Sequence, residues 1–569
     1  MKFPLSKSAV TKMQAVVIIA IIVIVAIAGA TYYMATLPSG PTPTASPTPT
    51  PTASPTARLV RIGNAWPIYL DPGVGQDFAS QAAQTNVYDP VVWPTPDGSV
   101  IPWVATNWTV SSDGLAYTFS IRSGIKFHSG RELTAEDVAF SMNRLLTVGQ
   151  SYAFLYTPYV DRAEALDTYT VKFTLKKLMG PFVSSLIRLY IVDKQEIMDH
   201  LVTPGAYGEF GDYGTSWLTT HDAGSGPYKV KEIKLDAYVK VEVYSNYWYA
   251  EGFNPKAPTE IHFLPTAANP ATQKTMMNNK ELEVTDQWQS EEFLNSVDAL
   301  PGITKKSHTD ASEYYYMFHC AKKPTDDIHV RKALAYCYDY SLIMTEQYSR
   351  FTQSKSSVPM LLPGAIDCQM YYYNLTKAEE ELKQSKYYPD IIENPNNYEI
   401  TFLVMTDVPE RERDALHLAE QAALIGLKIT LEKVPWMAYI EQMSNIETAP
   451  HIATMAIGAY YPDTGAMLLG KYHSSSVGTV SQNEWLRNAT IDAMIDDAIA
   501  TLNETERFAK YEGIQRAIMD ICPTMFIYDY KIVECIQDYV SIPSFEDPAE
   551  NYGLQGYDVA CRTWEVNPP

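Results

Sequence analysis

The sequence predicts an α/β protein of several lobes behind one apolar N-terminal helix. Strand-like and helix-like periodicities are mixed throughout, and the first 57 residues differ sharply in composition from the rest. The chain of 569 residues also exceeds the ~250 to 300 at which a single core usually stops growing. Its 46% apolar and 19% charged residues are typical of a globular protein. The net charge of −22 argues against a nucleic-acid partner, because binding phosphate backbones needs a basic surface.

A long apolar segment lies near the N-terminus. Residues 13–37 carry no charge, and as a helix rising ~1.5 Å per residue they would span roughly 37 Å, enough to cross a bilayer core. Lys2, Lys7 and Lys12 precede this segment, so the positive-inside rule places residues 1–12 in the cytoplasm and everything after residue 37 outside the cell. We therefore expect a transmembrane helix or signal anchor at residues 13–37. A cleaved signal peptide is the alternative, since Ala28-Gly29-Ala30 fits a small-residue cleavage site.

Residues 38–57 are a stalk-like segment, PSGPTPTASPTPTPTASPTA, rich in alternating Pro and Thr. Such a sequence cannot form a core and favours extended polyproline II, so its 20 residues at ~3.1 Å each would reach roughly 60 Å. A spacer of this kind has a role when its N-terminal end stays attached to the membrane. The segment therefore favours a retained anchor over a cleaved peptide.

Two further features fit a location outside the cell. Four N-x-S/T sequons could accept glycans, at Asn107, Asn374, Asn488 and Asn503. None of the six cysteines belongs to a C-x-x-C pair, which argues against zinc or thioredoxin-like chemistry and favours disulfides. Cys522 and Cys535 are the closest pair in sequence, and buried free thiols are the alternative.

The chain after the stalk alternates strands with helices. Residues 59–64 alternate as a strand, and Tyr117, Phe119 and Ile121 alternate on another. Thr134 and Asp137 predict a capping box at the start of a helix. Its apolar stripe consists of Val138, Met142, Leu145 and Leu146.

The second half follows the same pattern. Pro409 opens an expected helix that ends at Gly426, and a strand with alternating apolar residues follows at 427–431. Two late helices, Ile491–Leu502 and Glu504–Met519, precede an apolar strand at residues 523–528.

A contiguous run of motifs lies between Leu70 and Leu146. It comprises Leu70-Asp71-Pro72, Tyr88-Asp89-Pro90, Ala105 to Trp108, Asp113 to Gly130, and Thr134 to Val138. The later motifs are Gly224 to Tyr228, Asn246-Tyr247-Trp248, Val330 to Asp339, and Ile425 to Trp436. Together, over residues 59 to about 545, they resemble the signature of the family-5 extracellular solute-binding proteins, the peptide- and nickel-binding class of ABC importers.

The resemblance implies a two-lobed periplasmic-binding-protein-like fold (class II, cluster C) with an extra subdomain. We expect lobe 1 at residues 58–312 with the subdomain at about 90–220, lobe 2 at 313–525, and a return to lobe 1 at 526–569. The two chain crossings of the hinge are expected near Tyr314–Met317 and Thr524–Tyr528. Processing near Lys7-Ser8, as in archaeal members of the class, would leave the anchor in place.

The implied function is solute capture by lobe closure, without catalysis or cofactor. A ligand held from both sides stabilises the closed state, which ABC permease and ATPase subunits could recognise. The expected ligands are oligopeptides or oligosaccharides. A cell-surface structural or sensory ectodomain with the same fold is the alternative.

In peptide-binding relatives, an aspartate in a trp-x-x-asp-tyr-x-x-pro loop pairs with the ligand's ammonium. Here the corresponding stretch, residues 456–464, lacks the tryptophan and has Ala459 or Tyr460 at the aspartate position. Either Asp463 takes the role by a small register shift, or the ligand has no ammonium there. Loop aromatics suit both sugars and peptide side chains. The expected ligand-binding residues are Trp66, Trp288, Trp436, Tyr460, Tyr461 and Asp463.

Catalytic motifs find little support in the sequence. Residues 465–471 match the letters of a phosphate loop, but Tyr472 replaces the Ser or Thr that would bind magnesium. H-E-x-x-H and G-x-S-x-G do not occur, and the ten histidines show no metal-ligand spacing. We therefore expect no catalytic residues and no metal site.

Overall fold

The computed structural model describes residues 58–64, 68–265, 269–342, 351–368, 371–406 and 408–568. All of them belong to one compact unit, Ala57–Pro569. The expected cytoplasmic tail, membrane helix and stalk lie outside the described residues. Within the described ranges, no helix combines the length and apolar character that crossing a membrane requires.

The first sheet gathers strands that are distant in sequence. Its order is β1-β10-β9-β8, with β1 parallel to β10 and the other neighbours antiparallel. The strands span Leu59–Gly63 (β1), Tyr228–Lys234 (β8), Tyr238–Val243 (β9) and Glu260–Leu264 (β10). Helix α2 (Phe78–Val87) shares a hydrophobic core with this sheet. The strand expected at residues 59–64 is confirmed.

A second, antiparallel sheet forms the early part of the chain. Its order is β4-β5-β7-β6, with strands at Ala105–Val110 (β4), Ala116–Ile121 (β5), Val160–Asp167 (β6) and Thr170–Leu175 (β7). Tyr117, Phe119 and Ile121 alternate into its core as expected. Helix α3 (Ala135–Val148) begins after Thr134, and the predicted capping box with Asp137 is present.

The third sheet has six strands in the order β12-β16-β11-β15-β13-β14. They span Ile303–Phe318 (β11), Phe351–Gln353 (β12), Ile400–Met405 (β13), Ile429–Val434 (β14), Ile452–Gly458 (β15) and Thr524–Gln537 (β16). The helices of this part are α9 (Ile328–Cys337), α11 (Leu375–Gln384), α12 (Asp390–Glu393), α13 (Pro409–Leu424), α14 (Trp436–Met443), α15 (Thr464–Tyr472), α16 (Ala489–Ala500) and α17 (Glu504–Ile521). The expected helices at 409–425, 491–502 and 504–519 are confirmed within a few residues.

Shorter elements complete the described chain. They are β2 (Val92–Pro94), β3 (Val100–Pro102), α4 (Ala153–Tyr156), α5 (Phe182–Ser185), α6 (Lys194–Asp199), α7 (Pro270–Asn278), α8 (Glu291–Asp298), β17 (Val540–Ser541), α18 (Pro543–Glu546) and β18 (Glu565–Val566).

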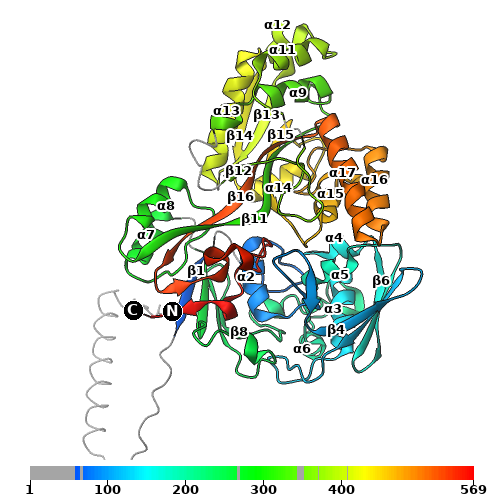
Figure 1. Cartoon of the computed structure of the whole chain (residues 1–569), viewed down its shortest axis with the longest axis vertical. Helices are drawn as coiled ribbons and strands as arrows, with labels where there is room; N and C mark the ends of the chain where they lie inside the picture. The colour runs from blue at the N-terminus through cyan, green and yellow to red at the C-terminus, as the bar shows by residue number, and fades with distance from the viewer. Residues whose placement is uncertain are drawn as a thin grey trace, which may run out of the picture. The chain divides into compact units, whose positions relative to one another are not determined.

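Two long strands connect the parts of the molecule. β11 and β16 pair antiparallel from Ile303 opposite Gln537 to Met317 opposite Thr524. One end packs with α7 and α8, and the other lies between β12 and β15 (Figure 1). Their register shifts between Thr309 and Glu313, where a β-bulge locally breaks the ladder. The expected crossings fall on this strand pair, and their role as a hinge stays a prediction.

The expected Cys522–Cys535 disulfide is wrong, because all six cysteines are free. Cys522 ends α17 and Cys535 lies near the end of β16. An extended strand of this length separates the two residues by roughly 40 Å at ~3.3 Å per residue, whereas a disulfide needs Cα atoms within about 7 Å. The alternative of buried thiols therefore holds for Cys522 and Cys535.

Three of the four sequons serve as helix N-caps. The Asn374, Asn488 and Asn503 side chains accept backbone hydrogen bonds at the starts of α11, α16 and α17. Asn107 is exposed on β4. N-capping gives these three asparagines a structural role of their own, and glycosylation stays a prediction.

Candidate functional site

Residues 456–463 form the end of β15 and the turn into α15. Tyr460 is half-buried there, and its hydroxyl lies 3.0 Å from the Ser481 hydroxyl. Its ring lies 5.1 Å from that of Phe154 and 5.9 Å from that of Tyr152, both in the early part of the chain. The loop that the sequence nominated is therefore a contact between the two halves of the described chain.

Arg188, which was not among the residues expected from the sequence, stabilises this contact. Its guanidinium donates to the Tyr460 carbonyl, and its Nη1 donates to Gln81 Oε1 and to the Gln555 carbonyl, each at 2.9 Å. The side chain is 1% exposed and lies over the rings of Tyr152 and Tyr557. One buried cation thus joins α2, the 456–463 loop and the C-terminal segment.

Asp463 has a structural environment. It is 2% exposed and caps α15 through a 2.8 Å bond from the Gly465 amide. It also accepts from the Tyr511 hydroxyl at 2.7 Å and forms an ion pair with Arg507 at 3.0 Å. Burial raises the pKa of Asp463, and Arg507 opposes that shift. The carboxylate is already surrounded by donors, so its expected role as an ammonium ligand stays a prediction that this geometry does not favour.

The remaining nominated aromatics are dispersed. Tyr461 is completely buried in the core. Trp288 meets Tyr530 edge-on at 5.9 Å, whereas Trp436 stacks on Tyr439 at 6.2 Å. Trp66 lies outside the described residues. Of the six nominated residues, the structure thus groups Tyr460, Tyr461 and Asp463 on one loop and places the two described tryptophans on other elements.

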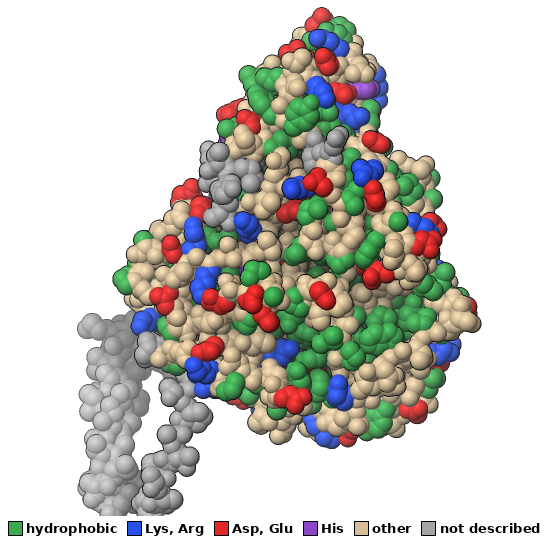
Figure 2. Space-filling model, in the orientation of Figure 1, with side chains coloured by type: hydrophobic (Ala, Val, Ile, Leu, Met, Phe, Trp, Pro, Cys, Tyr) green, Lys and Arg blue, Asp and Glu red, His purple; other side chains and the backbone are tan. Residues whose placement is uncertain are grey.

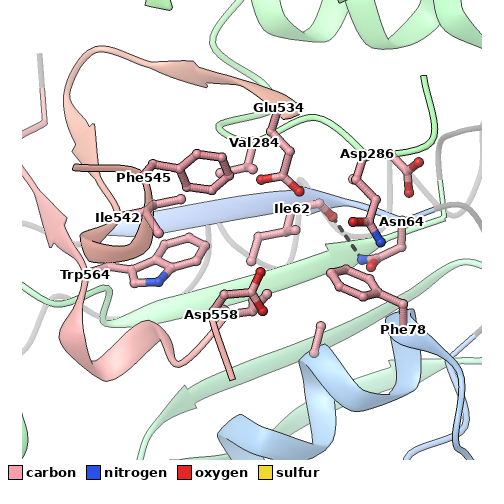
Figure 3. A pocket seen from close by; sticks show the side chains of 14 residues that line it. Ile62, Asn64, Phe78, Val284, Asp286, Glu534, Ile542, Phe545, Asp558 and Trp564 are labelled. Carbon is pink, nitrogen blue, oxygen red and sulfur yellow. Dashed lines mark hydrogen bonds between the residues drawn. The ribbon is translucent and has the colours of Figure 1, made fainter. Parts of the chain in front are cut away.

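A second candidate lies where β1, β16 and the C-terminal segment meet, and we call it the acidic cavity (Figure 3). Its acids are Asp286, Glu534 and Asp558, and Phe78, Phe545 and Trp564 are its aromatic walls. The rest of its lining is Ile62, Gly63, Asn64, Ala82, Val284, Gln287, Ile542 and Val559. The space between these atoms is about 380 Å³ including the opening to solvent, and the enclosed part has room for about one water-sized group.

The acids of this cavity differ from Asp463 in their surroundings. Glu534 is only 8% exposed, and among the described residues no hydrogen-bond donor or cation contacts its carboxylate. Burial, together with the nearby charges of Asp558 and Asp286, raises its pKa well above the ordinary range. Asp558 Oδ2 lies 3.3 Å from Nε2 of His308, while its Oδ1 is buried without a hydrogen-bond partner.

The sequence missed Glu534 because its strand was expected to end at residue 528. β16 instead continues to Gln537 and is buried along nearly its whole length. A glutamate inside such an apolar run, KIVECIQ, is the signal that could have been noticed. Asp558 and Asp286 gave no comparable signal, because only the fold brings them to the same cavity.

The rejected catalytic motif proves to be structural. Residues 465–471 lie inside helix α15, and the Lys471 ammonium is buried. It pairs with Glu313, donates to the Ser357 carbonyl at 2.9 Å and lies over the Tyr315 ring. Across the residues that the structure describes, no group of three His, Cys, Asp or Glu side chains is placed to hold a metal ion.

The visible surface agrees with the net charge. Figure 2 shows basic side chains scattered singly among acidic and polar ones, without an extended basic area on this face.

Comparison with known proteins gives a consistent result. Residues 99–479 match the family described as bacterial extracellular solute-binding proteins, family 5. The haem-binding protein A of Haemophilus influenzae is 26% identical over 453 residues, covering 74% of this chain and 77% of that protein. The oligopeptide-binding protein AppA of Bacillus subtilis is 26% identical over 434 residues, covering 73% and 75%.

Solved structures show the same fold. The structure of Bacillus subtilis AppA in complex with a nonapeptide superimposes with a TM-score of 0.73 at 19% identity and covers 90% of this chain and all of that one. At this identity the likeness concerns the fold alone.

Proposed function

Because the chain belongs to the family-5 extracellular solute-binding proteins, we propose that it captures an oligopeptide by closing two lobes and delivers it to an ABC importer. The observation that carries the proposal is the strand pair that joins the two α/β assemblies of the chain. Two long paired strands, β11 and β16, join two α/β assemblies, and a β-bulge interrupts them between Thr309 and Glu313. A second register shift follows between Tyr314 and Tyr315. A strand pair can bend where its ladder is broken in this way.

Contacts between residues 177–188 and residues 460–499 support a closed arrangement of the two assemblies. Arg188 donates to the Tyr460 carbonyl, the Gly180 amide donates to the Ile499 carbonyl at 2.7 Å, and Lys177 lies 3.4 Å from Asp496. These bonds form only when the early part of the chain meets the 456–502 region. A ligand between the two parts would stabilise this arrangement by its differential affinity for the closed state.

The relatives' names support a peptide as ligand. AppA carries oligopeptide binding in its name and was solved with a nonapeptide. An oligosaccharide remains the second expectation, because the Tyr460 loop presents aromatic rings and hydroxyls rather than a free carboxylate.

The expected position of the protein follows from the same proposal. The family is extracellular, and the apolar segment 13–37 would hold the chain in the membrane as a single-pass anchor. The Pro/Thr stalk at 38–57, with a reach of roughly 60 Å, would keep the loaded domain close to its permease and raise its effective concentration there. Bond-breaking chemistry has no part in this mechanism.

Thermal-shift and calorimetric titrations test the proposal. Purified full-length protein in detergent is screened against di- to nonapeptides and against malto- and cello-oligosaccharides. We expect a concentration-dependent rise in melting temperature with peptides, because a ligand that binds only the native state stabilises it. A rise in melting temperature with oligosaccharides alone would show that the ligand is a sugar and not a peptide. No rise with any solute would favour the structural or sensory ectodomain.

A further inference from the structure

We propose that the acidic cavity binds a positively charged nitrogen of the ligand, a primary ammonium. This inference rests on the proposed function and specifies one subsite of it. It assigns the charge recognition to residues of β16 and the C-terminal segment, far in sequence from the 456–463 loop.

The first argument is the unpaired acid. Glu534 is nine-tenths buried and points into the cavity, and no described donor or cation contacts it (Figure 3). Burying a carboxylate without a partner costs several kcal/mol by the usual order of magnitude. Such a cost is offset either by a partner within the protein or by a group of the bound ligand. Among the described residues no partner for the Glu534 carboxylate is present.

The second argument is the facing acid. Asp558 enters from the opposite wall of the cavity, and its Oδ1 is also buried without a hydrogen-bond partner. Its Oδ2 faces His308, whose Nδ1 lies 3.0 Å from the Thr309 carbonyl. Burial opposes the charged form of His308, but the Asp558 carboxylate and the Thr309 carbonyl raise its pKa overall, so His308 takes up Oδ2 and leaves Oδ1 without a partner. One nitrogen with several N–H donors could satisfy Glu534 and Asp558 Oδ1 together.

The walls narrow the class of ligand. Phe78, Phe545 and Trp564 surround the acids, and aromatic faces attract cations. The enclosed space fits about one water-sized group, which is the size of an ammonium rather than of a sugar ring. A divalent metal is the poorer match, because the described residues hold no group of three acids or histidines close enough to ligate one.

The acidic cavity lies near the residues that the proposed lobe closure involves. Asp558 follows three residues after Gln555, whose carbonyl accepts from Arg188, and Arg188 in turn holds the Tyr460 loop. Glu534 lies on β16, three residues from the partner of Thr309 at the bulge. A cation bound here would therefore neutralise acids next to both the strand break and the Arg188 contact.

The test uses isothermal titration calorimetry on full-length protein in detergent. The probes are trialanine, N-acetyltrialanine, which lacks the ammonium, N-acetyl-lysyl-dialanine, which returns a positive charge on a side chain, and maltotriose. The variants are Glu534→Gln and Asp558→Asn, with Glu550→Gln as the matched control because Glu550 is exposed in the same C-terminal segment.

We expect the wild type and the control to bind a charged probe at least tenfold more tightly than N-acetyltrialanine, and each cavity variant to lose that preference. Thermal melting verifies that the variants fold. Charged and uncharged peptides that bind equally, or cavity variants that keep the full preference, would overturn the cavity's role and leave peptide capture intact. Wild-type protein that binds none of the probes would overturn both proposals.

Discussion

Asp463 and Glu534 are both buried carboxylates, yet their environments are opposite. Asp463 is surrounded by the Gly465 amide, the Tyr511 hydroxyl and the Arg507 guanidinium. Glu534 has no donor or cation among the described residues. Burial alone therefore does not assign a role to an acid. A carboxylate with internal partners stabilises the fold, and one without them has capacity left for a ligand.

Glu484 stands between these two cases. Its Oε1 accepts from the Thr524 hydroxyl at 2.6 Å, while its Oε2 is buried without a partner. Burial raises the pKa of Glu484 to about 8. The three acids form a series in which internal partners decrease from Asp463 to Glu484 to Glu534.

The largest effect is expected at the fully partnered acid. Asp463→Asn should lower the free energy of unfolding by about 3–5 kcal/mol, because it leaves the Arg507 charge buried without its counter-ion. Chemical denaturation measures the change. Asp496→Asn is the control, since the Asp496–Lys177 pair is half exposed and should contribute about 0–1 kcal/mol. Equal small losses in both variants would remove the distinction between the two kinds of acid.

Glu484 should make stability depend on pH. Its pKa of about 8 in the folded protein lies above its ordinary value, so between these values the folded state keeps a proton that the unfolded state has released. Stability is then highest in acid and falls as the pH rises, by about 1.4 kcal/mol per pH unit for one such group. Glu484→Gln should flatten the slope measured between pH 5 and pH 8. A slope that survives the substitution unchanged would assign it to other acids.

Substitution of Glu534 should change the free energy of unfolding in the opposite direction to substitution of Asp463. Glu534→Gln removes a group whose ionisation is penalised by burial, so the free energy of unfolding at pH 8 should rise by about 1–2 kcal/mol. Chemical denaturation without ligand measures this, with Glu550→Gln expected to have no effect. A loss as large as that of Asp463→Asn would mean that Glu534 has a structural partner after all.

A smaller effect is expected at the loop itself. Tyr460→Phe loses the hydroxyl contact with Ser481 but keeps the ring against Phe154, so it should cost about 0.5–1.5 kcal/mol. Tyr69→Phe is the matched control, because Tyr69 is half exposed. A tenfold loss of ligand affinity in Tyr460→Phe would show that the hydroxyl contacts the ligand directly.

No effect is expected from reduction. Because all six cysteines are free, a reducing agent should leave the melting temperature unchanged. Thiol titration in denaturant should count six free groups per chain. Fewer groups would return the disulfide prediction to consideration.

The local helices and strands and the family could be predicted from the order of the amino acids. The helix after Thr134, the helix from Pro409 and the late helix pair appear within a few residues of their expected bounds, because caps and apolar periodicity act over a few residues. The motif order from Leu70 onward likewise identified the family that the comparisons show. These signals are carried by neighbouring residues and can be read along the chain.

The partners of the buried side chains could not be predicted in this way, because they depend on the fold. Asp463 was the nearest acid in the expected loop, but Arg507 and Tyr511 come from a helix that begins 41 residues later and take up its carboxylate. Glu534, Asp558 and Asp286 share a cavity although Asp286 precedes the others by more than 240 residues. The free energy of a buried charge depends on what surrounds it in space, and the order of residues along the chain does not contain that information.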